Sequence, residues 1–326
     1  MKIGILGSGF IVRQALTTIE ALKEVEVAAL WVRNRNSTSI IALDSEFALP
    51  QIFAGQEQLA DFFADTTFDT VYVALPNASH FDYARQALNA GKNVILEKPF
   101  TMTYEEAQAL AELARFKNLF LFEAIMSRYS ANYQHLRASL DKIGPVKLVQ
   151  ANYSQYSSRY NRYMQGTVLP AFSVPDGGGA LMDLNIYCLH FVEGLFGLPE
   201  DVAYWPNLGW NGIDTSGVCL LDYGPFKAVC SGAKDSASRS GVIIQGVFGT
   251  IYADCVPGRV ENVTLVQNGQ TTSLDVKPLG DPMADEFLAM DKVMKENDHA
   301  TADRWLRQTV EVMQIVDKAR KVLKAD

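Results

Sequence analysis

The N-terminal third of the chain alternates strand patterns with helical patterns, and this alternation limits the folds open to it. Short apolar or β-branched runs, typical of strands, cover Lys2–Leu6, Val25–Val32, Thr70–Leu75, Asn93–Leu96 and Leu119–Phe122. Helical segments separate these runs. Strands that alternate with helices predict an α/β domain built on a parallel, doubly wound sheet.

The pattern changes after about Glu123. β-type segments joined by hairpin-like turns follow, at residues 146–157, 217–223, 227–231, 242–248 and 263–267. Helical patterns cover residues 180–196, 284–296 and 302–322. Strands joined by tight turns predict an α+β domain with a mostly antiparallel, open sheet. We therefore expect two domains, over residues 1–122 and 123–326, with the last helix a candidate to pack back on the first domain.

The charge balance and the cysteines argue against several classes of protein. The 326 residues include 29 Lys and Arg against 37 Asp and Glu, which gives a net charge of −8. An acidic chain without a basic run is a poor candidate for binding nucleic acid or a membrane surface. The four cysteines stand far apart without a CxxC motif, so we expect no metal site. No apolar stretch reaches the ~20 residues that span a bilayer, and we expect a cytoplasmic protein.

A glycine pair follows the first predicted strand. Gly7 and Gly9 flank one serine, and a helix opens directly behind them at Phe10 and Ile11. Glycines there allow a tight turn and a close approach to a pyrophosphate, and the helix N-terminus offers free N–H groups. Val12 stands where a third glycine would complete the motif. The turn predicts a dinucleotide site, with an ordinary strand–helix turn as the alternative.

The end of the second strand distinguishes NADP from NAD. An acidic side chain there would hold a ribose 2′-hydroxyl. The chain instead has Arg33, Asn34 and Arg35. A guanidinium suits a 2′-phosphate by charge and by bidentate geometry. We therefore expect NADP, with NAD as the second choice; solvated loop charges are the alternative interpretation of the arginines.

The segment Glu97-Lys98-Pro99 lies at the carboxyl end of a predicted parallel strand. Ligands of open α/β sheets bind beyond such strand ends. A lysine held there can bind a substrate oxygen or lower the pKa of a nearby hydroxyl. A surface lysine beside a strand-ending proline remains the alternative.

Together with the glycine pair, these motifs resemble a known family. Leu75-Pro76-Asn77-Ala78-Ser79-His80 is similar to a TPNxxH segment, and Glu123–Arg128 is similar to an EAxMxR segment. The chain thus resembles the glucose–fructose oxidoreductase and inositol dehydrogenase (Gfo/Idh/MocA) family. The resemblance implies that Pro76, Asn77, His80, Glu97 and Lys98 lie near the bound cofactor.

A second motif lies in the C-terminal half. Residues 177–187 read GGGALMDLNIY, similar to the family's GGGALxDxGxY. Asp183 and Tyr187 are four residues apart on a predicted helix, so they share one face, which His190 borders. His190 is thus a further candidate to contact the substrate, with a packed supporting residue as the alternative. Inositol dehydrogenases have a histidine at the position of Tyr187. Tyrosine there resembles the subgroup of dimeric dihydrodiol dehydrogenase and NADP-dependent D-xylose dehydrogenase. Asn185 replaces the usual glycine.

These residues suggest a mechanism by which an alcohol loses a hydride to a nicotinamide and a proton to a base. A phenol with an ordinary pKa of about 10 is a poor base at neutral pH. A nearby ammonium lowers that pKa. Our hypothesis is that Tyr187 exchanges the proton, that Lys98 lowers its pKa and holds the substrate oxygen, and that Asp183 orients Lys98 or a substrate hydroxyl. A core-facing tyrosine is the alternative.

Aromatic and arginine side chains gather between Tyr153 and Tyr163. Tyr160 is a candidate to stack on a sugar ring, and these side chains could equally lie on a sheet face or an interface.

The resemblance also implies a homodimer through the C-terminal sheet. We expect an NADP-dependent oxidoreductase that transfers a hydride to or from a CH–OH/C=O carbon of a sugar, polyol or cyclic diol. A cofactor-binding regulator of the same fold, without turnover, is the alternative.

Overall fold

The computed structural model describes residues 1–277 and 280–324, which form two compact units. The first unit comprises Met1–Ala124 and Met283–Arg307, and the second comprises Ile125–Pro282 and Gln308–Asp326. The C-terminal helices therefore contribute to both. In the described part of the chain, no helix has the length and apolar character to cross a membrane. We predict that residues 1–122 bind the dinucleotide and that residues 123–326 bind the substrate and form the dimer. These roles stay predictions.

The first unit is built on a six-stranded sheet with the order β3-β2-β1-β4-β5-β6. Every neighbouring pair in it is parallel. This is the strand order of dinucleotide-binding sheets, whose order reverses between β1 and β4. The predicted doubly wound sheet is therefore confirmed. Its strands are β1 (Lys2–Leu6), β2 (Glu26–Val32), β3 (Gln51–Ala54), β4 (Thr70–Val73), β5 (Asn93–Glu97) and β6 (Leu121–Ala124).

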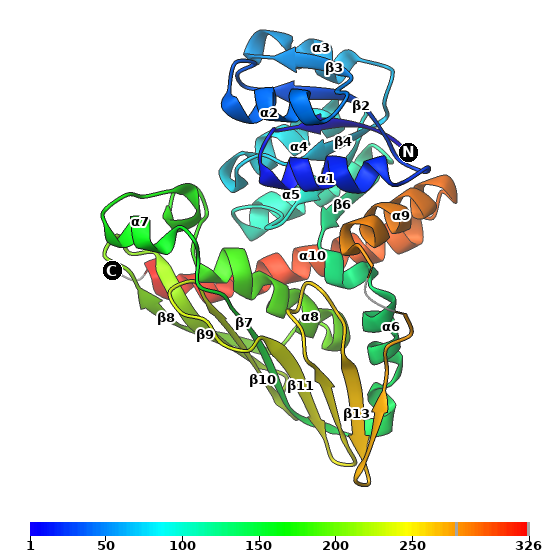
Figure 1. The fold of residues 1–326 in the computed structure, drawn as a ribbon. Helices are drawn as coiled ribbons and strands as arrows, with labels where there is room; N and C mark the ends of the chain where they lie inside the picture. Colours follow the sequence, from blue (N-terminus) through cyan, green and yellow to red (C-terminus); the bar gives the residue numbers. More distant parts are fainter. Residues whose placement is uncertain (278–279, 325–326) are drawn as a thin grey trace. The chain divides into compact units, whose positions relative to one another are not determined.

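Helices follow the strands of this sheet in alternation (Figure 1). Each presents an apolar stripe to the core, as Ala84, Ala87 and Leu88 do on α4. A side-chain cap starts α5, because the Thr103 hydroxyl accepts a hydrogen bond from the Glu106 N–H at 3.2 Å. The helices are α1 (Phe10–Glu20), α2 (Thr38–Glu46), α3 (Leu59–Ala64), α4 (His80–Asn89), α5 (Tyr104–Phe116) and α9 (Pro282–Lys295).

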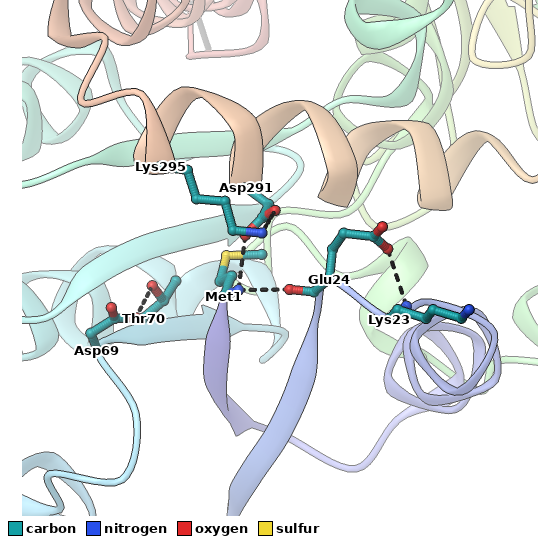
Figure 2. A network of polar contacts seen from close by, with 7 residues as sticks. All are labelled: Met1, Lys23, Glu24, Asp69, Thr70, Asp291 and Lys295. Carbon is teal, nitrogen blue, oxygen red and sulfur yellow. Dashed lines mark hydrogen bonds and ion pairs between the residues drawn. The ribbon is translucent and has the colours of Figure 1, made fainter.

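An ion-pair network ties α9 to the start of the first strand (Figure 2). The buried carboxylate of Asp291 accepts from the Met1 ammonium at 2.8 Å and pairs with Lys295 at 2.7 Å. The same ammonium donates to the Glu24 carbonyl oxygen at 2.6 Å. A helix from the far end of the sequence is thereby held on the N-terminal sheet.

The second unit contains an eight-stranded sheet with the order β14-β13-β12-β11-β7-β10-β9-β8. All neighbours are antiparallel except β7 and β10, which run parallel. The mostly antiparallel, open sheet is thus confirmed. Its strands are β7 (Val146–Ser154), β8 (Asp201–Leu208), β9 (Asp214–Asp222), β10 (Lys227–Ala233), β11 (Gly241–Gly246), β12 (Thr250–Ala253), β13 (Val263–Gln267) and β14 (Gln270–Ser273).

The strands that the sequence did not indicate are short or lie at an edge. The edge strand β8 contains Pro206, which lacks the N–H of a central strand and lowers the strand signal. The other edge strand, β14, is exposed throughout and has no apolar residue. It pairs with β13 through a two-residue turn at Asn268 and Gly269, whose φ angles of 51° and 75° suit a hairpin.

Helix α8 (Ile186–Phe196) lies along one face of this sheet, against β7 and β10 (Figure 1). It does not begin as the regular α-helix that we predicted over residues 180–196, because Leu181–Asn185 form a π-helical turn. The remaining helices are α6 (Ala131–Ala138), α7 (Tyr160–Met164) and α10 (His299–Arg320), the last of which supplies residues to both units.

A buried carboxyl group on α8, that of Glu193, meets a partly buried one, that of Glu311. Glu193 is 3% exposed, and its carboxyl group shares a hydrogen bond with that of Glu311 on α10. Burial, and to a lesser degree the hydrogen bond to Glu311 and its charge, raise the pKa of Glu193 from 4.5 to about 9, while Arg128 and Gln308 act in the opposite direction. Glu193 is therefore protonated in the folded protein at neutral pH.

This raised pKa makes stability depend on pH. Between pH 4.5 and about 9 the folded chain binds a proton at Glu193 that the unfolded chain has released. The free energy of unfolding must then fall as pH rises, by at most about 1.4 kcal/mol per pH unit from this group. We expect Glu193→Gln to flatten the dependence of Tm on pH in this window and to raise Tm at pH 8. Thermal unfolding of Glu112→Gln, at an exposed helical site, is the control; equal slopes in both variants would contradict the expectation.

Candidate functional site

A cleft of about 680 Å³ opens in the first unit at the carboxyl ends of β1, β2 and β4. It therefore lies where the strand order reverses, which is where open α/β sheets bind nucleotides. Among the predicted cofactor residues, Gly7, Gly9, Arg33, Asn34 and Pro76 line it. Its other lining residues were not predicted: Ser8, Val32, Ser37, Ser39, Ala74 and Leu75.

The two glycines of the β1–α1 turn are needed for different reasons. Gly7 has a φ of +129°, and a Cβ atom there would lie 2.5 Å from the Ala74 carbonyl oxygen. Only glycine fits that position, because β4 lies directly against the turn. Gly9 has an ordinary φ of −79°, and a Cβ there would meet no protein atom within 4 Å. The space beside Gly9 belongs to the cleft, so a methyl group would protrude into any ligand held there.

The first turn of α1 offers hydrogen-bond donors to the cleft. Gly9 is its N-cap and provides no side chain, so among the described residues no side-chain cap satisfies the first N–H groups of the helix. Such an end binds phosphate through these N–H groups and the helix dipole. The turn therefore fits a dinucleotide pyrophosphate.

Polar side chains also line the cleft. The exposed Arg33 and Asn34 follow β2, and the hydroxyl groups of Ser37 and Ser39 lie 3.2 Å apart at the start of α2. The Ser39 hydroxyl is 2.8 Å from that of Ser8. Arg35 instead donates to the Ile52 carbonyl oxygen at 3.4 Å and does not line the cleft. The cleft is thus lined by one guanidinium cation and several hydroxyl donors, a combination that suits an anionic ligand.

Six other predicted cofactor residues are not part of this lining, within the described chain. Phe10 is 73% exposed at the start of α1, and Ile11 follows it. The remaining four lie beyond the carboxyl ends of β4 and β5: Asn77, His80, Glu97 and Lys98.

His80 is fully buried and joins two backbone segments. One ring nitrogen lies 2.8 Å from the Leu75 carbonyl oxygen and the other 2.9 Å from that of Pro99. Burial lowers the pKa of His80, while the two carbonyl contacts act to raise it. The ring has no surface for a ligand, and its contacts fix the segments that carry Pro76 and Lys98.

Lys98 is partly exposed and follows a buried acid. The carboxylate of Glu97 accepts from the Lys98 backbone N–H at 3.1 Å and from the hydroxyl of Tyr72. Burial raises the pKa of Glu97, whereas the Tyr72 hydrogen bond and the Lys98 charge lower it. The Lys98–Pro99 peptide bond is cis. Glu97 therefore supports the loop of Lys98.

In the second unit, Asp183 lies in the π-helical turn and forms an ion pair that the sequence did not indicate. Its carboxylate is 2.7 Å from the ammonium of Lys234, a residue directly after β10. Backbone hydrogen bonds in a π turn join residues five positions apart. The angular position of Asp183 relative to Tyr187 around the helix axis therefore differs from that in the regular helix that we predicted.

Tyr187 is partly buried at the start of α8. Its ring contacts that of Tyr153 at 5.7 Å between centroids. A Cβ atom on Gly258 would lie 3.0 Å from the Tyr187 ring, so the chain passes close to it there. His190, one turn further on, is 3% exposed and lies in the core of this unit.

Asn185 occupies the position that is glycine in the family motif, and the neighbouring strand β10 accommodates its side chain. Its side-chain amide donates to the Cys230 carbonyl oxygen at 3.1 Å. A Cβ on Gly232 would lie 2.9 Å from the Cβ of Asn185. The space that Asn185 takes is thus left by a glycine on β10.

The predicted substrate residue Tyr160 belongs to an aromatic cluster around α7. Its ring lies 5.6 Å from that of Tyr156, 5.9 Å from that of Tyr163 and 5.8 Å from that of Phe172. Tyr163 in turn stacks on Trp210 at 5.2 Å. Tyr160 is partly buried within this cluster, whereas Tyr156 is exposed and Tyr163 is buried.

Comparisons with known proteins give the same picture as these motifs. A model of the oxidoreductase family with an NAD-binding Rossmann fold matches residues 1–125. The scyllo-inositol 2-dehydrogenase (NADP(+)) IolU of Bacillus subtilis is 32% identical over 98% of this chain and 96% of that protein. The trans-1,2-dihydrobenzene-1,2-diol dehydrogenase of Xenopus laevis is 30% identical over 86% of this chain and 83% of that protein. The chain belongs to the Gfo/Idh/MocA family.

A solved structure of the same fold is the 3-ketoreductase KijD10 of Actinomadura kijaniata, in complex with NADP and TDP-benzene. It has a TM-score of 0.83 with 22% identity and covers 98% of this chain and 97% of that one. The resemblance drawn from the motifs is confirmed, and this Gfo/Idh/MocA member is an NAD(P)-binding oxidoreductase.

The sequence analysis did not identify two groups of residues at the candidate site. Ser37 and Ser39 follow Arg33 closely enough that a serine-rich helix start after β2 could have indicated them. Lys234 had no local signal, because it reaches Asp183 across 51 residues of chain. Which of these side chains bind ligand stays a prediction.

The two glycines allow a test with an internal control. We expect Gly9→Ala to leave the free energy of unfolding within about 0.5 kcal/mol of the wild type, because its Cβ meets no protein atom. The same change should weaken NADPH binding at least about tenfold, because the methyl group enters the cleft. Gly7→Ala should instead lower the free energy of unfolding by about 1–3 kcal/mol, through its positive φ and the clash with Ala74. Urea unfolding and NADPH fluorescence titration measure both; normal NADPH affinity in Gly9→Ala would show that the cleft is not the cofactor site.

Proposed function

We propose that the protein is an NADP-dependent dehydrogenase or reductase that interconverts a secondary alcohol and a ketone on a sugar, polyol or cyclic diol. The observation that carries the cofactor choice is the cleft, whose lining, among the described residues, has the Arg33 guanidinium and serine hydroxyls but no carboxylate. A 2′-phosphate suits such a lining, and a 2′-hydroxyl has no acidic acceptor there.

The substrate class rests on relatives that match most of the chain. One is named as a scyllo-inositol 2-dehydrogenase that uses NADP(+), and another as a dihydrobenzenediol dehydrogenase. Both names describe hydroxyl groups on six-membered carbon rings. A ring alcohol with a neighbouring hydroxyl is therefore the substrate chemistry that we assign to this chain.

The bound nicotinamide would accept or supply the hydride. Tyr187 would take the proton from the substrate hydroxyl, or return it in the reduction. Lys98 would bind the same oxygen and, by its charge, favour the phenolate of Tyr187. Acid–base help of this kind is typically worth about 10²–10⁴-fold in rate.

Three further side chains would orient the substrate or support the site. The carboxylate of Asp183 would accept from a second substrate hydroxyl, since carboxylates bind hydroxyl groups as strong acceptors. Tyr160 would offer a ring face to the substrate. His190 lies too deep in its unit to meet a solvated ligand, so its part would be to support α8.

The function is tested with NADP(H) and NAD(H) on a panel of inositols, aldoses, ketoses and cyclic diols. We expect a change in NADPH absorbance with at least one ring polyol or diol, and kcat/KM for NADP at least about tenfold above that for NAD. Preference for NAD would contradict the role of Arg33. Absence of turnover on the whole panel would favour the cofactor-binding regulator instead.

The role of Tyr187 has a separate test. We expect Tyr187→Phe to lower kcat by about 10²–10⁴-fold, because it removes the only proton that the ring can exchange. The dissociation constant for NADPH should stay within about twofold, because the cofactor cleft lies in the other unit. Tyr153→Phe, which keeps the ring contact with Tyr187, is the matched control for packing. Full turnover in Tyr187→Phe would remove the proton role.

We propose further that the enzyme works as a homodimer, in the cytoplasm, through the open face of the eight-stranded sheet. Alternate residues of β10 face opposite ways: Ala228 and Cys230 are buried, whereas Val229 and Ser231 line a groove of about 730 Å³. Ile243 and Tyr252 line the same groove beside polar residues, and exposed apolar side chains on an open sheet face favour burial against a partner. Light scattering should give twice 36.0 kDa for the wild type. Val229→Glu should give the monomer mass, and a monomeric wild type would contradict the proposal.

A further inference from the structure

Lys234 is a buried cation whose ammonium reaches the predicted substrate residue Asp183. Its side chain is 2% exposed, and its Nζ lies 2.7 Å from Asp183 Oδ2. The same Nζ donates to the Ala171 carbonyl oxygen at 2.6 Å and lies 4.7 Å from the centre of the Phe172 ring. The ammonium is thus held between a carboxylate, a carbonyl and an aromatic face, all of which favour a positive charge.

The backbone of Lys234 is fixed as firmly as its side chain. Its N–H donates to the Thr215 carbonyl oxygen of β9 at 2.8 Å, directly after the last pair of β10. The Lys234 stem is therefore anchored in the sheet. The sheet therefore limits where its ammonium can lie.

The π-helical turn around Asp183 is anchored to the same strands at both ends. The Leu181 N–H donates to the buried Asp214 carboxylate on β9 at 2.7 Å, and Asn185 donates to the Cys230 carbonyl oxygen of β10. Lys234 provides the contact in the middle of the turn. These contacts together fix the depth and the orientation of the turn against the sheet.

The ion pair is asymmetric in its access to solvent. Lys234 is buried, whereas the Asp183 side chain is 35% exposed. Burying both charges of an ion pair costs free energy, because both lose their hydration. The Asp183 side chain retains solvent-exposed surface, which a ligand hydroxyl can reach.

We propose that Lys234 is a positioning residue of the active site, which holds the Asp183 carboxylate aimed at a substrate hydroxyl. This rests on the proposed function, in which Asp183 binds that hydroxyl. A carboxylate with one oxygen on a fixed ammonium has lost most of its rotational freedom before the substrate arrives. Such preorganisation lowers the cost of binding and of aligning the reacting carbon.

Replacing Lys234 by Met keeps the length of the side chain and its contact with Phe172 and removes the charge. We expect kcat/KM for the active polyol to fall by about 10²-fold, with KM rising as well as kcat falling, because the carboxylate is misplaced in both the ground state and the transition state. Lys234→Arg, which keeps the charge, should recover about tenfold of that loss. The affinity of the NADPH complex for the polyol, measured by calorimetry, should fall in parallel.

A double-mutant cycle separates positioning from a general effect on folding. If Lys234 acts through Asp183, Lys234→Met should change kcat/KM less than about threefold in an Asp183→Asn background, because residues that act as a unit are not additive. Lys92→Met is the control. Lys92 is also buried, donates to the Phe68 carbonyl oxygen at 2.7 Å and lies over that ring, so it should lower Tm without changing kcat/KM.

The outcomes are distinct. Wild-type turnover with unchanged KM and kcat in Lys234→Met would overturn the positioning role and leave the proposed function in place. Independent losses for the two substitutions, or a loss in Lys234→Met that Lys234→Arg does not reduce, would equally overturn it. A wild type without turnover on the whole panel would overturn the proposed function, and the role of Lys234 with it.

Discussion

The turn after β1 lies so close to β4 that the backbone of Gly7 faces the Ala74 carbonyl oxygen with no room for a side chain. This contact closes the bottom of the crevice where the parallel sheet changes direction, and it aims the N-terminus of α1 outward. The cleft exists because the turn is held there, and the free N–H groups of α1 face it because the turn ends at Gly9. The cofactor chemistry of the first unit follows from this one steric constraint.

Buried polar groups hold the loops around the site in place. Both ring nitrogens of His80 contact carbonyl oxygens, those of Leu75 and Pro99. The carboxylate of Glu97 accepts a hydrogen bond from the backbone N–H of Lys98. In the second unit, Lys234 holds Asp183. Each of these groups would be costly to bury alone, so each has a partner that fixes a chain segment. Several residues of the family motifs thus support chain segments through hydrogen bonds to the backbone.

The strands and the main motifs were readable from sequence because their signals are local. Apolar runs such as TVYVAL predict buried parallel strands wherever they occur, and the glycine pair follows the first strand directly. The edge strands β8 and β14 were missed, because Pro206 interrupts the strand pattern of β8 and β14 has no apolar residue. The π turn at Asp183 was missed as well, since it depends on contacts with β9 and β10 rather than on helix propensity.

The sequence by itself determined the fold class, the family and the placement of Lys98, Asp183 and Tyr187 in recognisable motifs, because each of these rests on residues that are neighbours along the chain. Only the tertiary structure decided which polar groups partner them. Lys234 meets Asp183, and Ser39 meets Ser8, through strands that are distant in sequence and adjacent in a sheet. Hydrogen bonds and ion pairs act over about 3 Å, and no local pattern records which distant segments a folded sheet brings within that range.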